Sequence, residues 1–161
     1  MSERPDIAAA AAYALQVIGV YDSYLSERGI SWAGASILEL GPGRDFAPQI
    51  LMVDRGATVT VADRFLATWD PAYHPALYRE VRAQVGASPA LDRVIEQGGY
   101  DGVITTVGEP AESMPSIADG SFDIVFSNAV LEHVYDIRAV ARELRRVSKP
   151  GAIHSHAGRD P

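Results

Sequence analysis

The chain has 161 residues, of which 47% are hydrophobic and 22% are charged, a balance typical of one globular domain. Acidic residues outnumber basic ones by 21 to 14, and the formal charge of −7 argues against a nucleic-acid partner, which a basic surface would bind. Cysteine is absent, which excludes disulfides, thiolate metal ligands and a cysteine nucleophile, and we expect a reducing, cytoplasmic environment. No apolar run reaches membrane-span length, and no signal-peptide pattern is present, so we expect no membrane partner.

Helical and strand patterns alternate along the chain. Apolar residues repeat at helical spacing over residues 5–28, where Pro5 suits the first turn and Gly29 the end. The apolar and β-branched runs that predict strands are residues 36–40, 58–62, 103–107, 122–127 and 152–156. The helices predicted between them are residues 46–55, 75–85, a short helix from 88–89 to 98–99, and 136–147 with Asp136 as N-cap.

This alternation predicts βαβ units and therefore a parallel sheet with right-handed crossovers and helices on both faces. We predict a single α/β domain over residues 1–161, with a doubly wound, mostly parallel, Rossmann-like sheet. An N-terminal helix within residues 1–30 precedes a core over residues 36–156. Ligands bind such sheets at the carboxyl ends of the strands. The site should therefore be lined by the loops that follow Leu40, Ala62, Val107 and Ser127.

A glycine turn follows the first predicted strand, where residues 39–43 are Glu-Leu-Gly-Pro-Gly. Gly41 and Gly43 allow a sharp backbone turn and the close approach of a ligand. A plain turn between strand and helix is the alternative interpretation. The full dinucleotide-binding fingerprint is absent, because Phe46 stands where its third glycine is expected.

Asp63 ends the second predicted strand, about 20 residues after the glycine turn. An acidic side chain at this position can accept hydrogen bonds from two ribose hydroxyls. The alternative is a loop aspartate that caps its own turn. The position at the carboxyl end of a strand favours the ribose-binding role.

Two longer segments complete the pattern: residues 118–134, ADGSFDIVFSNAVLEHV, and residues 142–151, RELRRVSKPG. Together with the glycine turn and Asp63, they resemble the class I S-adenosylmethionine-dependent methyltransferases of the small-molecule type, over about residues 36–151. The resemblance implies S-adenosylmethionine as cofactor and S-adenosylhomocysteine as product. It implies an enzyme that methylates a small-molecule acceptor, with residues 36–156 as its cofactor-binding core.

The resemblance also assigns roles to single residues. Gly41, Pro42 and Gly43 would pass close to the methionine part of the cofactor, and Glu39 would lie near its amino group. The other implied positions are Asp63 at the ribose hydroxyls, Arg64, Glu109, Ala111 and Glu112 at the adenine, and Asn128 and Ala129 beneath the sulfonium. The chain departs from the family at Asp45, where a third glycine is frequent. Its adenine loop also differs, which leaves Glu109 or Glu112 as the acid that faces the adenine.

His133 is the candidate catalytic residue. A base is useful when the acceptor must lose a proton, and histidine suits that task near neutral pH. The alternative is that His133 packs at a helix start. No metal site is expected: His154 and His156 share one strand face, but no third ligand accompanies them.

The aromatic segment 69–78 predicts a core edge in preference to a substrate-binding patch. We expect acceptor selection to depend on the N-terminal helix and on residues 64–100. The family fold continues past the fifth strand with a helix and an antiparallel strand pair, so we interpret the chain as truncated there. Strand five would then be an unprotected edge, and we expect it either to pair with a second copy of the chain or to be disordered.

Two other functions stay open. One is a chain that binds the cofactor but is inactive, because truncation removes the acceptor pocket. The other is a dinucleotide-binding oxidoreductase of similar layout, against which the missing third glycine and the Leu-Glu-His segment at 131–133 argue.

Overall fold

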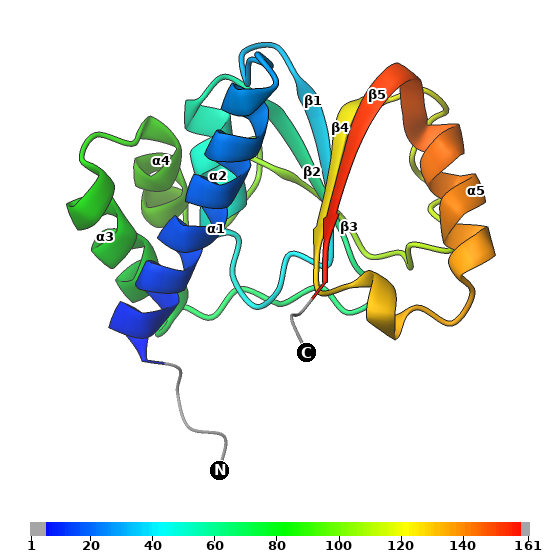
Figure 1. The fold of residues 1–161 in the computed structure, drawn as a ribbon. Helices are drawn as coiled ribbons and strands as arrows, with labels where there is room; N and C mark the ends of the chain where they lie inside the picture. Colours follow the sequence, from blue (N-terminus) through cyan, green and yellow to red (C-terminus); the bar gives the residue numbers. More distant parts are fainter. Residues whose placement is uncertain (1–5, 159–161) are drawn as a thin grey trace.

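The computed structural model describes residues 6–158 and contains a five-stranded sheet in the order β3-β2-β1-β4-β5, with every neighbouring pair parallel. The strands are β1 (Ser36–Leu40), β2 (Thr58–Ala62), β3 (Thr105–Val107), β4 (Phe122–Asn128) and β5 (Ser148–Ala157). The helices are α1 (Ile7–Glu27), α2 (Ala47–Asp54), α3 (His74–Val85), α4 (Pro89–Gln97), the 3-10 turn η1 (Leu131–His133) and α5 (Ile137–Val147). Helices α1 to α4 cover one face of the sheet and α5 covers the other, which confirms the doubly wound α/β fold (Figure 1).

Local signals place the helix ends where the sequence predicts them. Ser88 accepts a hydrogen bond from the Leu91 amide at the start of α4, and Asp136 accepts two from the first turn of α5. Helix α1 begins after Asp6, whose carboxylate accepts from the Ala8 amide. The predicted role of Pro5 lies outside the described residues.

Two predicted strands have different lengths in the structure. Strand β3 begins at Thr105 rather than 103, because the amides of Val103 and Ile104 both donate to the Tyr100 carbonyl in a turn. Strand β5 begins at Ser148 rather than 152. A register shift opposite residues 122–124 of β4 accommodates Pro150 and the positive φ of Gly151 within the longer strand.

The core lies in two layers on the two faces of the sheet. On the α1 side, Tyr21 stacks on Phe126 of β4, with ring centroids 4.1 Å apart and planes at 12°. On the α5 side, Leu38 and Val125 pack against α5. Successive residues of β1 and β4 thus point to opposite layers, and both central strands are buried on both faces.

The aromatic segment 69–78 belongs to the core edge, as predicted. Tyr73, His74 and Tyr78 are buried, and Trp69 packs against them. His74 accepts a hydrogen bond from the Asp70 amide through Nδ1, and its Nε2 lies 3.1 Å from the Arg44 carbonyl oxygen. This cluster supports the loop that follows the glycine turn from behind.

Strand β5 forms one end of the sheet and pairs with β4 only. Among residues 6–158, no helix combines the length and the apolar character needed to cross a membrane. The order of the strands reverses between β1 and β4, and the loops after these strands separate there. That switch point positions the site described next.

Candidate functional site

A cleft of about 840 Å³ opens at the carboxyl ends of β1, β2 and β4. Nearly all of the sequence-predicted site residues line it. They are Glu39, Gly41, Pro42, Gly43, Asp63, Arg64, Ala111, Glu112, Asn128, Ala129 and His133. The structure therefore brings together side chains that are up to 94 positions apart in the numbering, as the parallel topology requires.

The glycine turn forms the floor of the cleft. Gly41 has φ +60° and Gly43 has φ +85°, both in the left-handed region that glycine adopts without strain. The Gly41 amide donates to the Ala62 carbonyl at 2.9 Å, which ties the turn to the end of β2. A Cβ at Gly41 would overlap the Val130 side chain, so this position requires glycine for space as well as for conformation.

Asp63 has the loop-capping role that the sequence left open as the alternative, and it also lines the cleft. Its Oδ1 accepts a hydrogen bond of 2.8 Å from the Phe65 amide, which is the loop-capping arrangement. Its Oδ2 has no hydrogen-bond partner among residues 6–158, and the residue lines the cleft. One oxygen thus holds the loop, and the other stays available to a ligand hydroxyl.

The rim of the cleft near Asp63 is formed by Arg64, Glu112 and Tyr135. The Arg64 guanidinium lies 5.7 Å from the centroid of the Tyr135 ring. Glu112 accepts a hydrogen bond of 3.0 Å from the Tyr135 amide. Tyr135 is 90% exposed and Phe65 is 84% exposed, so two aromatic rings stand at the mouth of the cleft. The sequence pattern did not indicate either ring.

Glu109 is the one predicted site residue that does not line the cleft. Its carboxylate accepts hydrogen bonds from the Ser116 amide and from Ser116 Oγ, the latter at 2.8 Å. These bonds hold Glu109 within its own loop. Of the two acids proposed to face the adenine, only Glu112 reaches the cleft.

Glu39 is buried at the inner wall of the cleft, with 2% of its surface exposed. Its Oε1 accepts a hydrogen bond of 2.8 Å from the Tyr21 hydroxyl, and its Oε2 accepts one of 2.6 Å from Gln49 Nε2. Burial raises the pKa of Glu39 to about 7, and the two hydrogen bonds oppose that rise. The sequence indicated Glu39 but not its two partners.

Helix α1 closes the cleft on the side of β4. Tyr13, Ala14 and Val17 line the cleft from α1, and Asn128 Nδ2 donates to the Tyr13 hydroxyl at 3.3 Å. Ala129 has φ +55°, an uncommon conformation for a residue with a Cβ, and its amide donates to the Ala157 carbonyl. Helix α1 therefore contributes to the cleft through its first half and to the core along its whole length.

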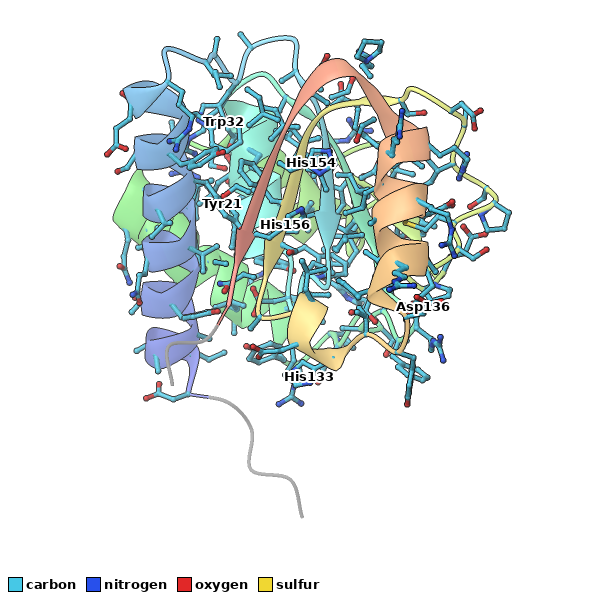
Figure 2. The ribbon with its side chains drawn as sticks, turned by 45° about the vertical axis from the view of Figure 1, so that its right-hand side comes forward. Tyr21, Trp32, His133, Asp136, His154 and His156 are labelled. Atoms are coloured by element: carbon cyan, nitrogen blue, oxygen red, sulfur yellow. The ribbon has the colours of Figure 1, made fainter. Side chains whose placement is uncertain are left out.

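His133 ends η1 and lies at the end of the sheet where the cleft opens (Figure 2). Its side chain is 71% exposed, and Nε2 lies 3.4 Å from Glu132 Oε1. This exposure argues against the alternative in which His133 packs at a helix start. The imidazole is free to meet a molecule that enters the cleft.

His154 and His156 lie outside the cleft. They project from β5 on the side of α5, where His154 Nε2 is 2.8 Å from Ser148 Oγ and His156 Nδ1 is 2.7 Å from Ser127 Oγ (Figure 2). Within residues 6–158, no three histidine or acidic side chains are grouped so that they could hold a metal ion.

The site lies at the switch point of a parallel α/β sheet, and residues 38–155 match the model of the methyltransferase domain family. The chain belongs to this family. Membership favours methyl transfer over the oxidoreductase alternative.

Two relatives have similar sequences. A protein of Oryza sativa subsp. japonica, named "Probable tocopherol O-methyltransferase, chloroplastic", is 35% identical over 101 residues, which are 63% of this chain and 26% of that protein. Uncharacterized protein YafE of Escherichia coli K12 is 36% identical over 72 residues, 45% of this chain and 30% of that protein. The chain thus spans less than a third of the length of these curated relatives.

Two solved structures share the fold. One is described as a "putative s-adenosyl-l-methionine-dependent methyltransferase" from Methanococcus maripaludis, with a TM-score of 0.60 and 16% identity over 97% of this chain and 67% of that one. The other is a SAM-dependent methyltransferase from Aquifex aeolicus, with a TM-score of 0.51 and 18% identity over 80% of this chain and 58% of that one. At these identities the likeness establishes the fold.

Proposed function

We propose that the chain binds S-adenosylmethionine in the cleft and serves methyl transfer to a small-molecule acceptor, with S-adenosylhomocysteine as the product. The observation that carries this proposal is the joint placement of Gly41, Asp63 and the Glu39–Gln49 pair around one cleft at the switch point of the sheet. Family membership supports the same reaction class.

The residues present fit this cofactor. Asp63 Oδ2 is available for ribose hydroxyls, and the backbone at Gly43, where a Cβ would meet no atom within 4 Å, is open to close approach. The buried Oε1 of Gln49 has no donor within the described part of the chain, and a ligand ammonium would supply one. When bound, S-adenosylmethionine supplies an electrophilic methyl group carried on a sulfonium.

We assign the remaining positions by their place around the cleft. Ala111 and Glu112 would flank the adenine together with Arg64, and Asn128 and Ala129 would lie beneath the sulfonium. The acidic side chains that line the cleft outnumber the arginines: they are Glu39, Asp45, Asp63 and Glu112, against Arg44 and Arg64. This charge suits a cationic, phosphate-free cofactor better than a dinucleotide.

We further propose His133 as the base that takes a proton from the acceptor. The printed name of the rice relative makes a phenol hydroxyl the first acceptor class to screen. On an acceptor found in that screen, His133→Ala should lower kcat by about 100-fold, the lower end of what a positioned base contributes. Its affinity for S-adenosylhomocysteine should stay within about twofold, or 0.4 kcal/mol.

His154→Ala is the matched control for this test, because His154 lies outside the cleft. An unchanged kcat in His133→Ala would exclude the base role. Binding of the cofactor without turnover on any acceptor would favour the alternative of an inactive cofactor-binding chain.

Asp63→Ala provides the primary test of the cofactor site. We expect the wild-type chain to bind S-adenosylhomocysteine in a calorimetric titration, and the variant to bind it at least about tenfold more weakly, a loss of about 1.4 kcal/mol. The reason is the lost acceptor for the ribose hydroxyls. Asp101→Ala, an exposed aspartate outside the cleft, is the control. A folded wild-type chain that binds no S-adenosylhomocysteine would refute the proposal.

We also propose that the chain forms one domain, with residues 36–156 as its cofactor-binding core, and that β5 pairs with β5 of a second copy. Strand β5 spans ten residues and pairs with β4 only, and the Tyr24 hydroxyl of α1 donates one hydrogen bond to the His154 carbonyl. Sedimentation equilibrium should then show a dimer at micromolar concentration. A monomer under those conditions would exclude the pairing.

A further inference from the structure

Tyr21, Glu39 and Gln49 form a buried row of hydrogen-bonded side chains from three different elements: α1, β1 and α2. Figure 2 shows Tyr21 between α1 and the sheet. The Tyr21 ring is fixed by its stacking on Phe126, so its hydroxyl has little freedom to leave Glu39. The row therefore holds the Glu39 carboxylate in one orientation at the inner wall of the cleft.

The hydrogen bonds of this row determine which way the Gln49 amide faces. Gln49 Nε2 donates to Glu39 Oε2 at 2.6 Å, so the NH₂ group of Gln49 faces Glu39. The amide oxygen, Oε1, then faces away from Glu39. It is buried, with the residue 1% exposed, and it has no hydrogen-bond partner among residues 6–158.

A buried acceptor without a donor is rare in folded proteins, because the loss of hydration is not compensated. Gln49 and Glu39 both line the cleft. A ligand group that carries both positive charge and several N–H donors would complement the Glu39 carboxylate and the unpaired oxygen of Gln49. A protonated primary amine has those properties, with three donors and no acceptor.

We propose that Gln49 is a specificity residue that accepts a hydrogen bond from the protonated amine of the ligand, with Tyr21 and Glu39 as the groups that position its amide. This inference rests on the proposed function, in which the amine is the α-ammonium of the methionine part of S-adenosylmethionine. Glu39 supplies the charge. Gln49 supplies a directional acceptor that the sequence did not reveal.

A site of this kind discriminates against ligands that leave its buried polar groups without hydrogen-bond partners. A ligand without the amine would bury Glu39 and Gln49 Oε1 without a donor, and sites built to hydrogen-bond a polar group reject analogues that lack it. The amine should therefore contribute strongly to affinity. The nucleoside part of the ligand, which lies toward Asp63, should be bound independently of Gln49.

The test measures the binding of two ligands to two proteins, which gives four affinities to compare. The ligands are S-adenosylhomocysteine and its deamino analogue, which keeps the nucleoside, the sulfur and the carboxylate. The proteins are the wild-type chain and Gln49→Leu. The quantity compared is the affinity ratio, the dissociation constant of the deamino analogue divided by that of S-adenosylhomocysteine. We expect this ratio to be at least about tenfold for the wild-type chain and below about threefold for Gln49→Leu.

Gln84→Leu is the matched control, because Gln84 also lies in a helix and donates to a glutamate, Glu80, but on the exposed surface. It should keep the wild-type ratio. Gln49→Met, which retains the side-chain length, replaces Gln49→Leu if the leucine variant fails to fold. Tyr21→Phe should lower the ratio partly, since it keeps the stacked ring and removes the hydroxyl.

The outcomes separate the two proposals. A wild-type chain that binds both ligands within about threefold, or a Gln49 variant that loses equal affinity for both, overturns the role of Gln49 and leaves the cofactor site intact. A folded wild-type chain that binds neither ligand overturns the proposed function itself. A tenfold wild-type ratio that collapses only in the Gln49 variant establishes the inference.

Discussion

Glu39→Gln should stabilise the fold at about pH 8 and, in the same protein, weaken the binding of S-adenosylhomocysteine. Burial raises the pKa of Glu39 from 4.5 to about 7, so the folded chain holds this proton more tightly than the unfolded chain does. Between these two values, unfolding releases the proton. The contribution of Glu39 to stability is therefore fully present below the unfolded pKa and is lost as the pH rises through the folded pKa.

The size of this effect follows from the shift. Each pKa unit corresponds to 1.36 kcal/mol, so ionising Glu39 in the folded chain costs about 3 kcal/mol above pH 7. Glutamine carries no charge and avoids that cost. Urea unfolding at about pH 5 and pH 8 should show that the variant gains stability over the wild type at the higher pH only.

Comparison of the variant with the wild type isolates Glu39 from other titrations in this range. Burial also raises the pKa of Asp45, and burial lowers the pKa of His154 and His156, but these groups are present in both proteins. Their contributions cancel in the difference. A difference in unfolding free energy that does not change between the two pH values would contradict the prediction.

The loss of binding in Glu39→Gln has a second cause besides the missing charge. The new amide needs an acceptor, and the Gln49 amide can supply one by turning its oxygen toward residue 39. Gln49 would then present its NH₂ group to the cleft and oppose an ammonium. We expect an affinity for S-adenosylhomocysteine at least about tenfold lower in a calorimetric titration at neutral pH. Retained affinity would mean that Glu39 does not face the ligand amine.

Gly41→Ala should destabilise the chain by about 2–5 kcal/mol, measured by urea unfolding. The left-handed conformation of Gly41, with φ +60°, costs about 1–2 kcal/mol for alanine. The added Cβ would also overlap the Val130 side chain, and such overpacking costs about 1–3 kcal/mol. The same Cβ would enter the floor of the cleft.

Gly43→Ala separates these two causes. Gly43 has φ +85°, but a Cβ there would meet no atom within 4 Å, so only the conformational cost of about 1–2 kcal/mol applies. Gly41→Ala should also be less costly in a Val130→Ala background, which removes the methyl groups that it meets. Equal destabilisation at Gly41 and Gly43 would exclude the overlap as a cause.

The sequence predicts the elements of this fold well wherever the signal is local. The caps at Ser88 and Asp136 and the glycine turn at 41–43 each depend on a few neighbouring residues, and the structure has them as predicted. Strand β5 is longer than expected because pairing with β4 carries the strand through Pro150 and Gly151, a pairing that the local sequence does not encode.

The candidate site likewise contains residues that the sequence indicates and residues that only the three-dimensional contacts reveal. Asp63 and Gly41 were found because each stands at a fixed position relative to the end of a strand. Gln49 and Tyr13 were not found, since their roles arise from contacts with Glu39 and Asn128 on other elements. Glu109 was placed in the site by its neighbours in sequence, whereas its hydrogen bonds to Ser116 hold it elsewhere.

The central position of β1 has a consequence for the order in which the chain folds. Strand β1 lies between β2 and β4, and the Ser36 amide donates to Asp123, a residue 87 positions away. During synthesis, the side of β1 that faces β4 must remain unpaired until that residue has left the ribosome. Contacts of such long sequence separation slow folding, because a large loop must close before they form. A nascent chain that stops short of β4 should therefore require protection of the β1 edge by a chaperone.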